Sequence, residues 1–239
     1  MSAVAQPMFS LNRHAQVRAI RVGRESRVLI IDNVLEAPAD MVEHAAARSD
    51  FSAESRHYYP GVTAPIQGNL ISELLLRLRP ALHSAYGLEP DTSLPATGYY
   101  SLVTRPQSEL LPLQTVPHVD DLNQVHLAMV LYLCEEKHGG TGFFRHLASG
   151  LEMVPRDKAA LYRQAIELTL KERQDYPPAY FQGSDEHYEQ IGSVQARFNR
   201  LIIYNSNLLH SGLVNPETLS ADPRNGRLTV NLFVGRGSQ

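Results

Sequence analysis

The sequence predicts an α+β chain, with helices near the N-terminus and a closed or sandwiched β-sheet in the remainder. Two observations lead to this prediction. Leucines recur at helical spacing within residues 69–86, whereas strand-like segments separated by turn-forming residues dominate from residue 96 onward. The chain has 239 residues, 43% of them hydrophobic, which is enough for one domain with a full core.

The N-terminal third begins with two predicted strands, over residues 17–22 and 27–32, separated by a turn-rich stretch. A helix over residues 39–48 is expected next. Asp40 lies near its start, where a carboxylate can satisfy free backbone N–H groups.

The clearest helix covers residues 69–86. Pro80 predicts a kink or a restart within it, and Gly87 is a natural stop. One face of this helix should be buried, because its apolar stripe repeats every fourth residue, at Leu70, Leu74, Leu78 and Leu82.

Seven further segments are rich in β-branched and aromatic residues and predict strands, over 97–104, 114–120, 125–134, 139–146, 190–195, 198–205 and 226–234. A helix over 156–176 interrupts them within an insert at about 150–187. This insert could recognise substrate, form dimer contacts or merely cover the sheet. We expect a single domain over 1–239, with N-terminal strands and helices over about 15–95 and the sheet core over 96–235.

Composition excludes several function classes. The formal net charge of −3 offers no broad basic field for nucleic acid or anionic lipid. The N-terminus lacks the apolar stretch of a secretory signal, and no window approaches the roughly 20 apolar residues that span a bilayer. Cys134 is the single cysteine and lies in an apolar run, so we expect it to be buried and unreactive. We therefore expect a cytoplasmic protein with no membrane or nucleic-acid partner.

A metal site is predicted by the segment Pro117-His118-Val119-Asp120. On a strand, residues i and i+2 point to the same face, so His118 and Asp120 present an imidazole and a carboxylate side by side. His210 follows a distant apolar strand and is the candidate third ligand. Two histidines and one carboxylate form a facial triad, which leaves three positions open on iron(II) for a chelating oxoacid and dioxygen.

Other interpretations of these residues stay open. The triplet HxD alone is a weak signal that also arises by chance. A His-Asp-His set can equally hold a catalytic zinc with a bound water, whereas a structural zinc would usually need a fourth ligand and often thiolates. Further histidines lie nearby in the sequence, and we expect them to be packed or solvent-facing: His126, His138 and His146.

A co-substrate site is predicted around Arg227, on the last core-like strand. A buried arginine is costly unless it is paired, and its guanidinium suits a ligand carboxylate bound at two points. Thr229 and Asn231 share its face of the strand, and Tyr132 could add a phenolic donor. Alternatively, Arg227 pairs with a protein carboxylate and Tyr132 only fills the core.

Taken in order, these motifs resemble the 2-oxoglutarate/iron(II) dioxygenases, in particular their prolyl-hydroxylase-like branch. The resemblance covers residues 96–235 and the RVLIIDNVL segment with its following helix. Two features depart from the family pattern: the spacing from His210 to Arg227 is longer than usual, and the insert is extra. The counterparts of the family motifs are His118-Val119-Asp120, Tyr132-Leu133, Gly139-Gly140, His210 and Arg227.

The resemblance implies a double-stranded β-helix (jelly roll) core, with iron(II) held by His118, Asp120 and His210. It also implies 2-oxoglutarate bound through Arg227 and Tyr132, assisted by Thr229 or Asn231. With dioxygen, such an enzyme hydroxylates a C–H bond and releases succinate and CO2. The carboxylate at position 120 resembles a hydroxylase rather than a halogenase.

The substrate class stays broad: an amino acid, a peptide or a small metabolite, bound in a cleft walled mainly by residues 58–66, 97–104 and the insert. Tyr99 and Tyr100 either line this cleft or pack in the core. A homodimer is possible on the sequence alone. Two other functions remain open, namely a zinc- or iron-dependent jelly-roll hydrolase or isomerase, and a non-catalytic binding protein of the same fold.

Overall fold

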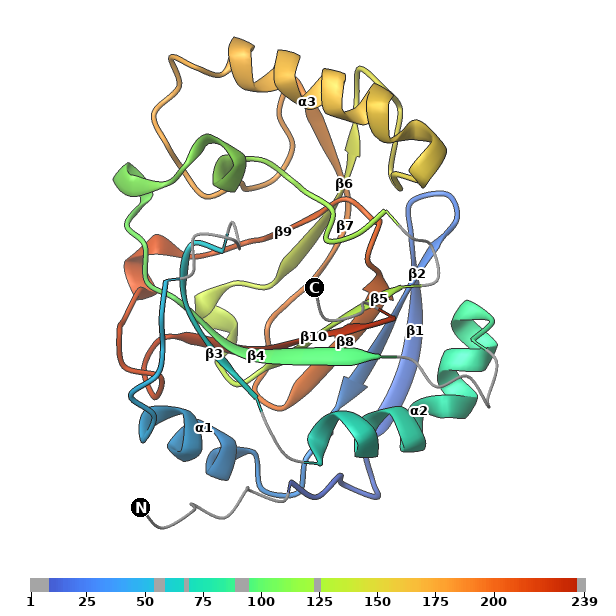
Figure 1. Ribbon diagram of the computed structural model, residues 1–239, viewed down its shortest axis with the longest axis vertical. Helices are drawn as coiled ribbons and strands as arrows, with labels where there is room; N and C mark the ends of the chain where they lie inside the picture. The colour runs from blue at the N-terminus through green and yellow to red at the C-terminus, as the bar shows by residue number, and fades with distance from the viewer. Residues whose placement is uncertain (1–8, 54–58, 67–68, 89–94, 123–125, 236–239) are drawn as a thin grey trace.

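The computed structural model describes residues 9–53, 59–66, 69–88, 95–122 and 126–235. Within these residues the strands form two antiparallel sheets of seven and three strands, and three α-helices flank them (Figure 1). The larger sheet, in spatial order, comprises β1 (Gln16–Val22), β2 (Ser26–Asp32), β8 (Arg200–Asn205), β5 (Leu127–Tyr132), β10 (Arg227–Val234), β4 (Ala96–Val103) and β3 (Gly61–Pro65). The smaller comprises β7 (Tyr188–Val194), β6 (Thr141–His146) and β9 (His210–Gly212).

The helices are α1 (Pro38–Ala46), α2 (Leu70–Tyr86) and α3 (Ala159–Glu172), and short 3-10 turns cover Gln107–Glu109, Pro112–Thr115, Glu136–His138, Arg156–Lys158 and Pro216–Thr218. None of the helices in the described part of the chain has the length and apolarity needed to cross a lipid bilayer. The helix α2 runs unbroken through Pro80, so the expected restart does not occur there. Gly87 ends it with a left-handed φ of 66°, as its position predicts.

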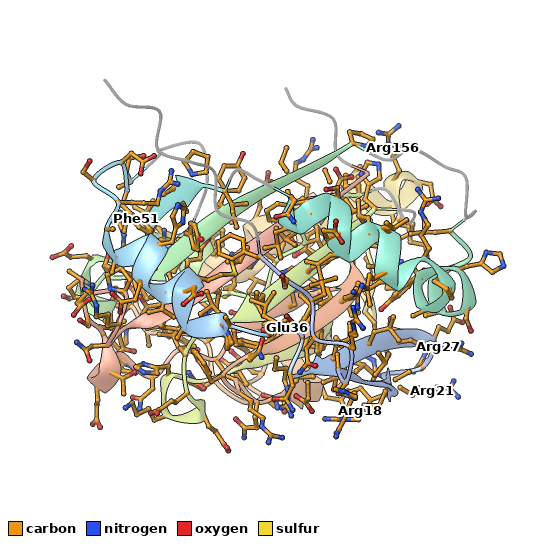
Figure 2. All side chains as sticks on the ribbon, turned by 90° about the horizontal axis from the view of Figure 1, so that it is seen from below. Arg18, Arg21, Arg27, Glu36, Phe51 and Arg156 are labelled. Atoms are coloured by element: carbon orange, nitrogen blue, oxygen red, sulfur yellow. The ribbon has the colours of Figure 1, made fainter. Side chains whose placement is uncertain are left out.

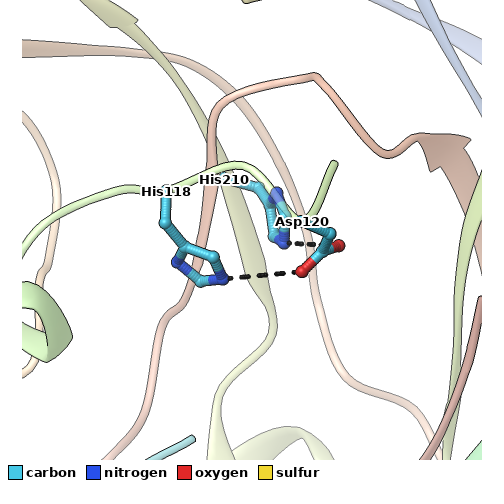
Figure 3. A group of neighbouring side chains, drawn as sticks. All are labelled: His118, Asp120 and His210. Carbon is cyan, nitrogen blue, oxygen red and sulfur yellow. Dashed lines mark ion pairs between the residues drawn. The ribbon is translucent and has the colours of Figure 1, made fainter. Parts of the chain in front are cut away.

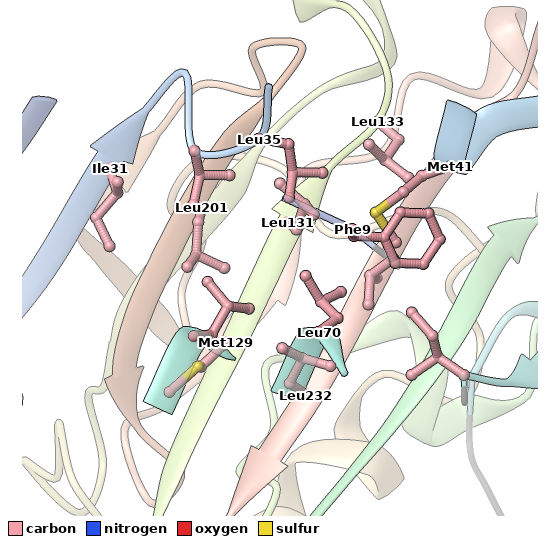
Figure 4. Packing of buried hydrophobic residues seen from close by; sticks show 14 of the residues in the cluster. Phe9, Ile31, Leu35, Met41, Leu70, Met129, Leu131, Leu133, Leu201 and Leu232 are labelled. Carbon is pink, nitrogen blue, oxygen red and sulfur yellow. The ribbon is translucent and has the colours of Figure 1, made fainter. Parts of the chain in front are cut away.

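Helices α1 and α2 pack on the outer face of the larger sheet (Figure 4). The four leucines of the predicted stripe in α2 are its buried residues, and they meet Leu131, Leu201 and Leu232 from the sheet. Each fully buried leucine contributes about 1.5–3 kcal/mol. This layer is therefore the main apolar support for the strands that carry the candidate site.

The opposite face of the larger sheet packs against the smaller sheet. Tyr132, Ile202 and Tyr204 from the larger sheet form one buried cluster with Phe143 and Val194 from the smaller. Strand residues alternate between faces. Because Leu228 and Val230 of β10 lie in the helix-side core, Arg227, Thr229 and Asn231 face the space between the sheets.

The insert covers the outer face of the smaller sheet. Ile166 of α3 is buried in a cluster with Phe144 of β6 and with Leu209. The predicted helix over 156–176 is shorter than expected, since it starts as a 3-10 turn and ends at Glu172. A covering role for the insert is thus visible, while substrate recognition and dimer contacts stay predictions.

The exposed edge of the larger sheet carries charge. Strand β1 is an edge strand, and Figure 2 shows Arg18 and Arg21 of β1, with Arg27 of β2, projecting from this hairpin. Charged side chains on an edge strand discourage pairing with the sheet of another molecule. The charges are thus consistent with β1 being the last strand at this side of the larger sheet.

The strands also differ from the sequence prediction in two ways. The predicted strand over 114–120 is wrong: a 3-10 turn occupies Pro112–Thr115, and only His118 forms an isolated bridge beyond it. Strands β3 and β9 were not predicted. They are short, and β3 contains a glycine and a proline, which are typical of sheet edges.

We expect Leu74→Ala to lower the free energy of unfolding by about 2–5 kcal/mol, because Leu74 is 1% exposed and the truncation leaves a cavity against the sheet. Leu76→Ala on the same helix is the matched control. Leu76 is 61% exposed, so its loss should change stability by no more than about 0.5 kcal/mol. Urea denaturation measures both, and equal effects would contradict the packing of α2 described above.

Candidate metal centre

Backbone pairing brings two distant histidines together. The His118 N–H donates to the His210 carbonyl, and the His210 N–H donates to the His118 carbonyl, both at 2.9 Å. On its other edge, His210 is paired with Phe143 of β6. The segment around His118 therefore extends the smaller sheet beyond β9, and the two imidazole rings lie with their centroids 4.5 Å apart.

Asp120 completes the group (Figure 3). Its N–H donates to the Ser206 carbonyl, which holds Asp120 beside the segment that leads into His210. Its carboxylate oxygens lie 3.8 Å from His118 Nε2 and 3.4 Å from His210 Nε2. Ligands about 2.1 Å from one ion and at right angles to each other lie about 3 Å apart. The three ligand atoms lie within 4.8 Å of one another, so the side chains could hold one metal ion if they moved closer together.

The chemistry of His210 suits ligation through Nε2. Its Nδ1 donates to the Leu208 carbonyl at 2.8 Å, which leaves the lone pair on Nε2, the nitrogen that faces Asp120. Burial lowers the pKa of His210 to about 4, although the Leu208 carbonyl opposes this shift. The imidazole is neutral at physiological pH, which is the state that binds a metal ion.

His118 forms the open side of the group. Its side chain is 53% exposed, whereas those of His210 and Asp120 are 7% and 16% exposed. Desolvation, and then the neighbouring His210, lower the pKa of His118 against the opposing effect of Asp120, and the exposure of the ring to solvent weakens this shift. We infer that molecules reach the site from the side of His118.

Arg227 lies between the same two sheets, and none of the described acidic residues forms an ion pair with it. It is 6% exposed, and its Nη2 donates to the Gly140 carbonyl at 2.9 Å, while its buried Nε has no hydrogen-bond partner. Within the described residues no carboxylate forms an ion pair with it, so the alternative of a protein carboxylate partner finds no support there. A buried guanidinium in this state favours binding of an external anion.

The three other predicted co-substrate residues lie close to Arg227, but their side chains already form hydrogen bonds within the protein. The Tyr132 ring lies 5.9 Å from the Arg227 guanidinium, and its hydroxyl is 2.6 Å from the Thr141 hydroxyl. Thr229 pairs with Tyr132 in the strand register and donates to the Asn231 amide oxygen at 3.1 Å. Arg227 is therefore the member of this set with the most unused binding capacity.

Two further tyrosines belong to this region. Tyr204 has no role predicted from the sequence, and Tyr59 is predicted only as part of the cleft wall over residues 58–66. The Tyr204 ring contacts His210 edge-on at 4.8 Å. Burial raises the pKa of Tyr204 well above its usual value, and the ring belongs to the same buried cluster as Tyr132. The available signal was that Tyr204 shares a face of β8 with Ile202, while Leu201 and Ile203 face the helix side. Tyr59 is the second, and its hydroxyl lies beside Arg227 and Thr229.

Other candidate residues lie elsewhere. His146 is packed between the hydroxyls of Ser149 and Thr169, and Cys134 is buried, as expected. Tyr100 does not line the cleft: it is in the helix-side core, where its hydroxyl meets His44 Nδ1 at 2.9 Å. Tyr99 lies opposite Asn231 and so is on the inner face.

His126 and His138 are also outside the metal group. The side chain of His126 is largely buried, with Nδ1 3.2 Å from the Asp121 carboxylate, and His138 is 4% exposed. In the described part of the chain, the one cluster that could hold a metal ion is the set His118, Asp120 and His210.

A family model matches residues 13–234, and its description is a family of unknown function, DUF6445. The chain belongs to this family. No curated protein sequence matches this DUF6445 chain.

Solved structures resemble the chain at low identity. The non-heme alpha ketoglutarate dependent epimerase SnoN from nogalamycin biosynthesis is 12% identical, with a TM-score of 0.47 over 87% of this chain and 77% of SnoN. HygX from Streptomyces hygroscopicus with iron bound is 14% identical, with a TM-score of 0.41 over 87% of this chain and 81% of HygX. EctD from S. alaskensis with bound Fe is 14% identical, with a TM-score of 0.42 over 95% of this chain and 86% of EctD. With TM-scores below 0.5, the similarity of these structures to this chain is weak.

We expect His210→Ala to weaken the affinity for iron(II) or cobalt(II) at least about 100-fold, because it removes one of three ligands from the most buried position. Equilibrium dialysis under anaerobic conditions measures this affinity. The control is His83→Ala, at an exposed histidine of α2, which should bind metal as the parent protein does. Unchanged binding in His210→Ala would place the metal elsewhere.

Proposed function

We propose that this protein is a non-haem iron(II)- and 2-oxoglutarate-dependent oxygenase. The observation that carries the proposal is the buried Arg227 guanidinium, which has no carboxylate partner among the described residues and faces the space between the sheets. The three-residue cluster alone supports only a metal site. A metal site together with an unpaired buried cation supports a metal bound with an anionic co-substrate.

His118, Asp120 and His210 would hold the iron(II). Arg227 would bind the far carboxylate of 2-oxoglutarate, with Tyr132 and either Thr229 or Asn231 beside it. When bound, iron(II) and 2-oxoglutarate supply the oxidising chemistry, in which dioxygen is consumed, succinate and CO2 are released and a substrate C–H bond is hydroxylated.

The protein contributes orientation and exclusion of water. The Leu208 carbonyl fixes the His210 ring through its Nδ1. The ring centroids of Tyr204 and Phe143 are 5.2 Å apart, and the Tyr204 ring also contacts His210. These two aromatic rings form the inner wall of the three-residue metal cluster. A dry inner wall strengthens the attraction between Arg227 and a bound carboxylate.

The finer assignments belong to the same proposal. We interpret the two facing sheets as a double-stranded β-helix of the prolyl-hydroxylase-like branch. Hydroxylation of an amino acid, a peptide or a small metabolite is the proposed reaction, and substrate is expected to enter on the exposed side of His118. Zinc-dependent hydrolysis or isomerisation, and simple binding, are the outcomes that the next experiment distinguishes from it.

Anaerobic addition of iron(II) and 2-oxoglutarate should give a weak visible charge-transfer band. Arg227→Ala should weaken 2-oxoglutarate binding at least about 30-fold while metal binding persists, because it removes one side of a buried charge pair worth about 2 kcal/mol or more. Arg224→Ala is the control, since Arg224 forms a surface ion pair with Glu43. A protein that retains zinc tightly and gives no band would contradict the oxygenase proposal.

A further inference from the structure

Unpartnered buried polar atoms meet at Arg227. Among the described residues, few buried side-chain nitrogen or oxygen atoms lack a hydrogen bond, and Arg227 Nε and the Tyr59 hydroxyl are two of them. The side chains of Arg227 and Thr229 lie close enough to the Tyr59 hydroxyl to influence its pKa. Neither of them forms a well-aligned hydrogen bond with that hydroxyl. Buried polar atoms usually have hydrogen-bond partners. Two neighbouring buried atoms without one therefore indicate that a ligand forms the missing hydrogen bonds.

The fold holds Tyr59 in place from outside the core strands. Strands β3, β4 and β10 align Gly61, Val103 and Arg227 in one row across the sheet. The Pro60 carbonyl accepts from the N–H groups of Thr104 and Arg105, which ties the segment before β3 to the end of β4.

Gly61 allows this close approach. A Cβ at this position would lie 2.1 Å from the Leu102 carbonyl oxygen, so a side chain there would push the segment away from β4. The Tyr59 ring packs against a small buried cluster that includes Val103 and Tyr180. Its hydroxyl is therefore directed by both backbone and packing, and its position does not depend on a ligand being present.

We propose that Tyr59 donates a hydrogen bond to the distal carboxylate of the co-substrate, so that a residue outside the core strands completes the anion site around Arg227. This inference rests on the proposed function. It names Tyr59 as a determinant of selectivity for 2-oxo acids that carry a second carboxylate.

The chemistry of the phenol suits this role. Burial raises the pKa of Tyr59 to about 12, despite the opposing effect of Arg227, so the hydroxyl keeps its proton at neutral pH. A protonated phenol donates to a carboxylate, and a hydrogen bond to a charged group is stronger than one between neutral groups.

Tyr180 provides a matched contrast in the same cluster. Its ring packs beside Tyr59, and it too lies within reach of the Arg227 charge. Its hydroxyl, however, donates to the Arg105 carbonyl at 2.6 Å, so its hydrogen-bonding capacity is used within the protein. Removal of the two hydroxyls should therefore have different effects.

The test compares Tyr59→Phe and Tyr180→Phe with the parent protein, by anaerobic calorimetric titration of the iron(II)-loaded protein. The ligands are 2-oxoglutarate and 2-oxobutanoate, which lacks the second carboxylate. We expect Tyr59→Phe to weaken 2-oxoglutarate binding about tenfold or more and to leave 2-oxobutanoate binding unchanged. Tyr180→Phe should leave the ratio of the two affinities unchanged.

Melting of the metal-free, ligand-free protein gives a second readout. Tyr59→Phe should melt no lower than the parent protein, because it removes a buried hydroxyl that has no partner, whereas Tyr180→Phe should melt lower because it leaves the Arg105 carbonyl unpaired.

Other outcomes overturn the inference. Parent-like 2-oxoglutarate binding in Tyr59→Phe would remove the hydroxyl from the site, and an equal loss for both ligands would make its role structural. If the parent protein binds neither 2-oxo acid, the proposed function itself fails and the inference fails with it.

Discussion

The candidate site depends on one backbone interaction, the pair of reciprocal hydrogen bonds between His118 and His210. These bonds join segments that are far apart in the sequence and place two imidazoles directly opposite each other. Because the Asp120 N–H is also bonded, to the Ser206 carbonyl, its carboxylate is held close to both imidazoles. Three ligand atoms are thus preorganised without any metal ion, which lowers the conformational entropy that binding would otherwise cost.

The second constraint is electrostatic. The sheets close over Arg227 with a backbone carbonyl as its hydrogen-bond acceptor and with tyrosines around it, but without an acidic side chain among the described residues. An unpaired buried cation destabilises the empty protein, so such a residue is retained most readily where a ligand anion pairs with it. The apolar layer between α2 and the larger sheet supplies the stability that tolerates this arrangement.

Much of this architecture could be predicted from the sequence because it follows local periodicity. The stripe at Leu70–Leu82 marks the buried face of α2, and the period of two marks the shared face of Arg227 and Thr229. The segment 114–120 is predicted as a strand because it is rich in β-branched residues, but its partner is a single residue of β9, which no local pattern reveals. Residues 58–66 are predicted as a cleft wall, but the place of Tyr59 beside Arg227 is not, since it depends on the long-range pairing of β3 with β4.

The central claim is that one metal ion and one dicarboxylate occupy the space between the sheets. Crystals grown without oxygen in iron(II) and 2-oxoglutarate, with anomalous diffraction recorded at the iron edge, test it most directly. The account predicts a single iron peak bounded by His118, Asp120 and His210, with the distal carboxylate of 2-oxoglutarate on Arg227. An iron peak elsewhere, or a bound 2-oxoglutarate that leaves Arg227 without an anion, would contradict it.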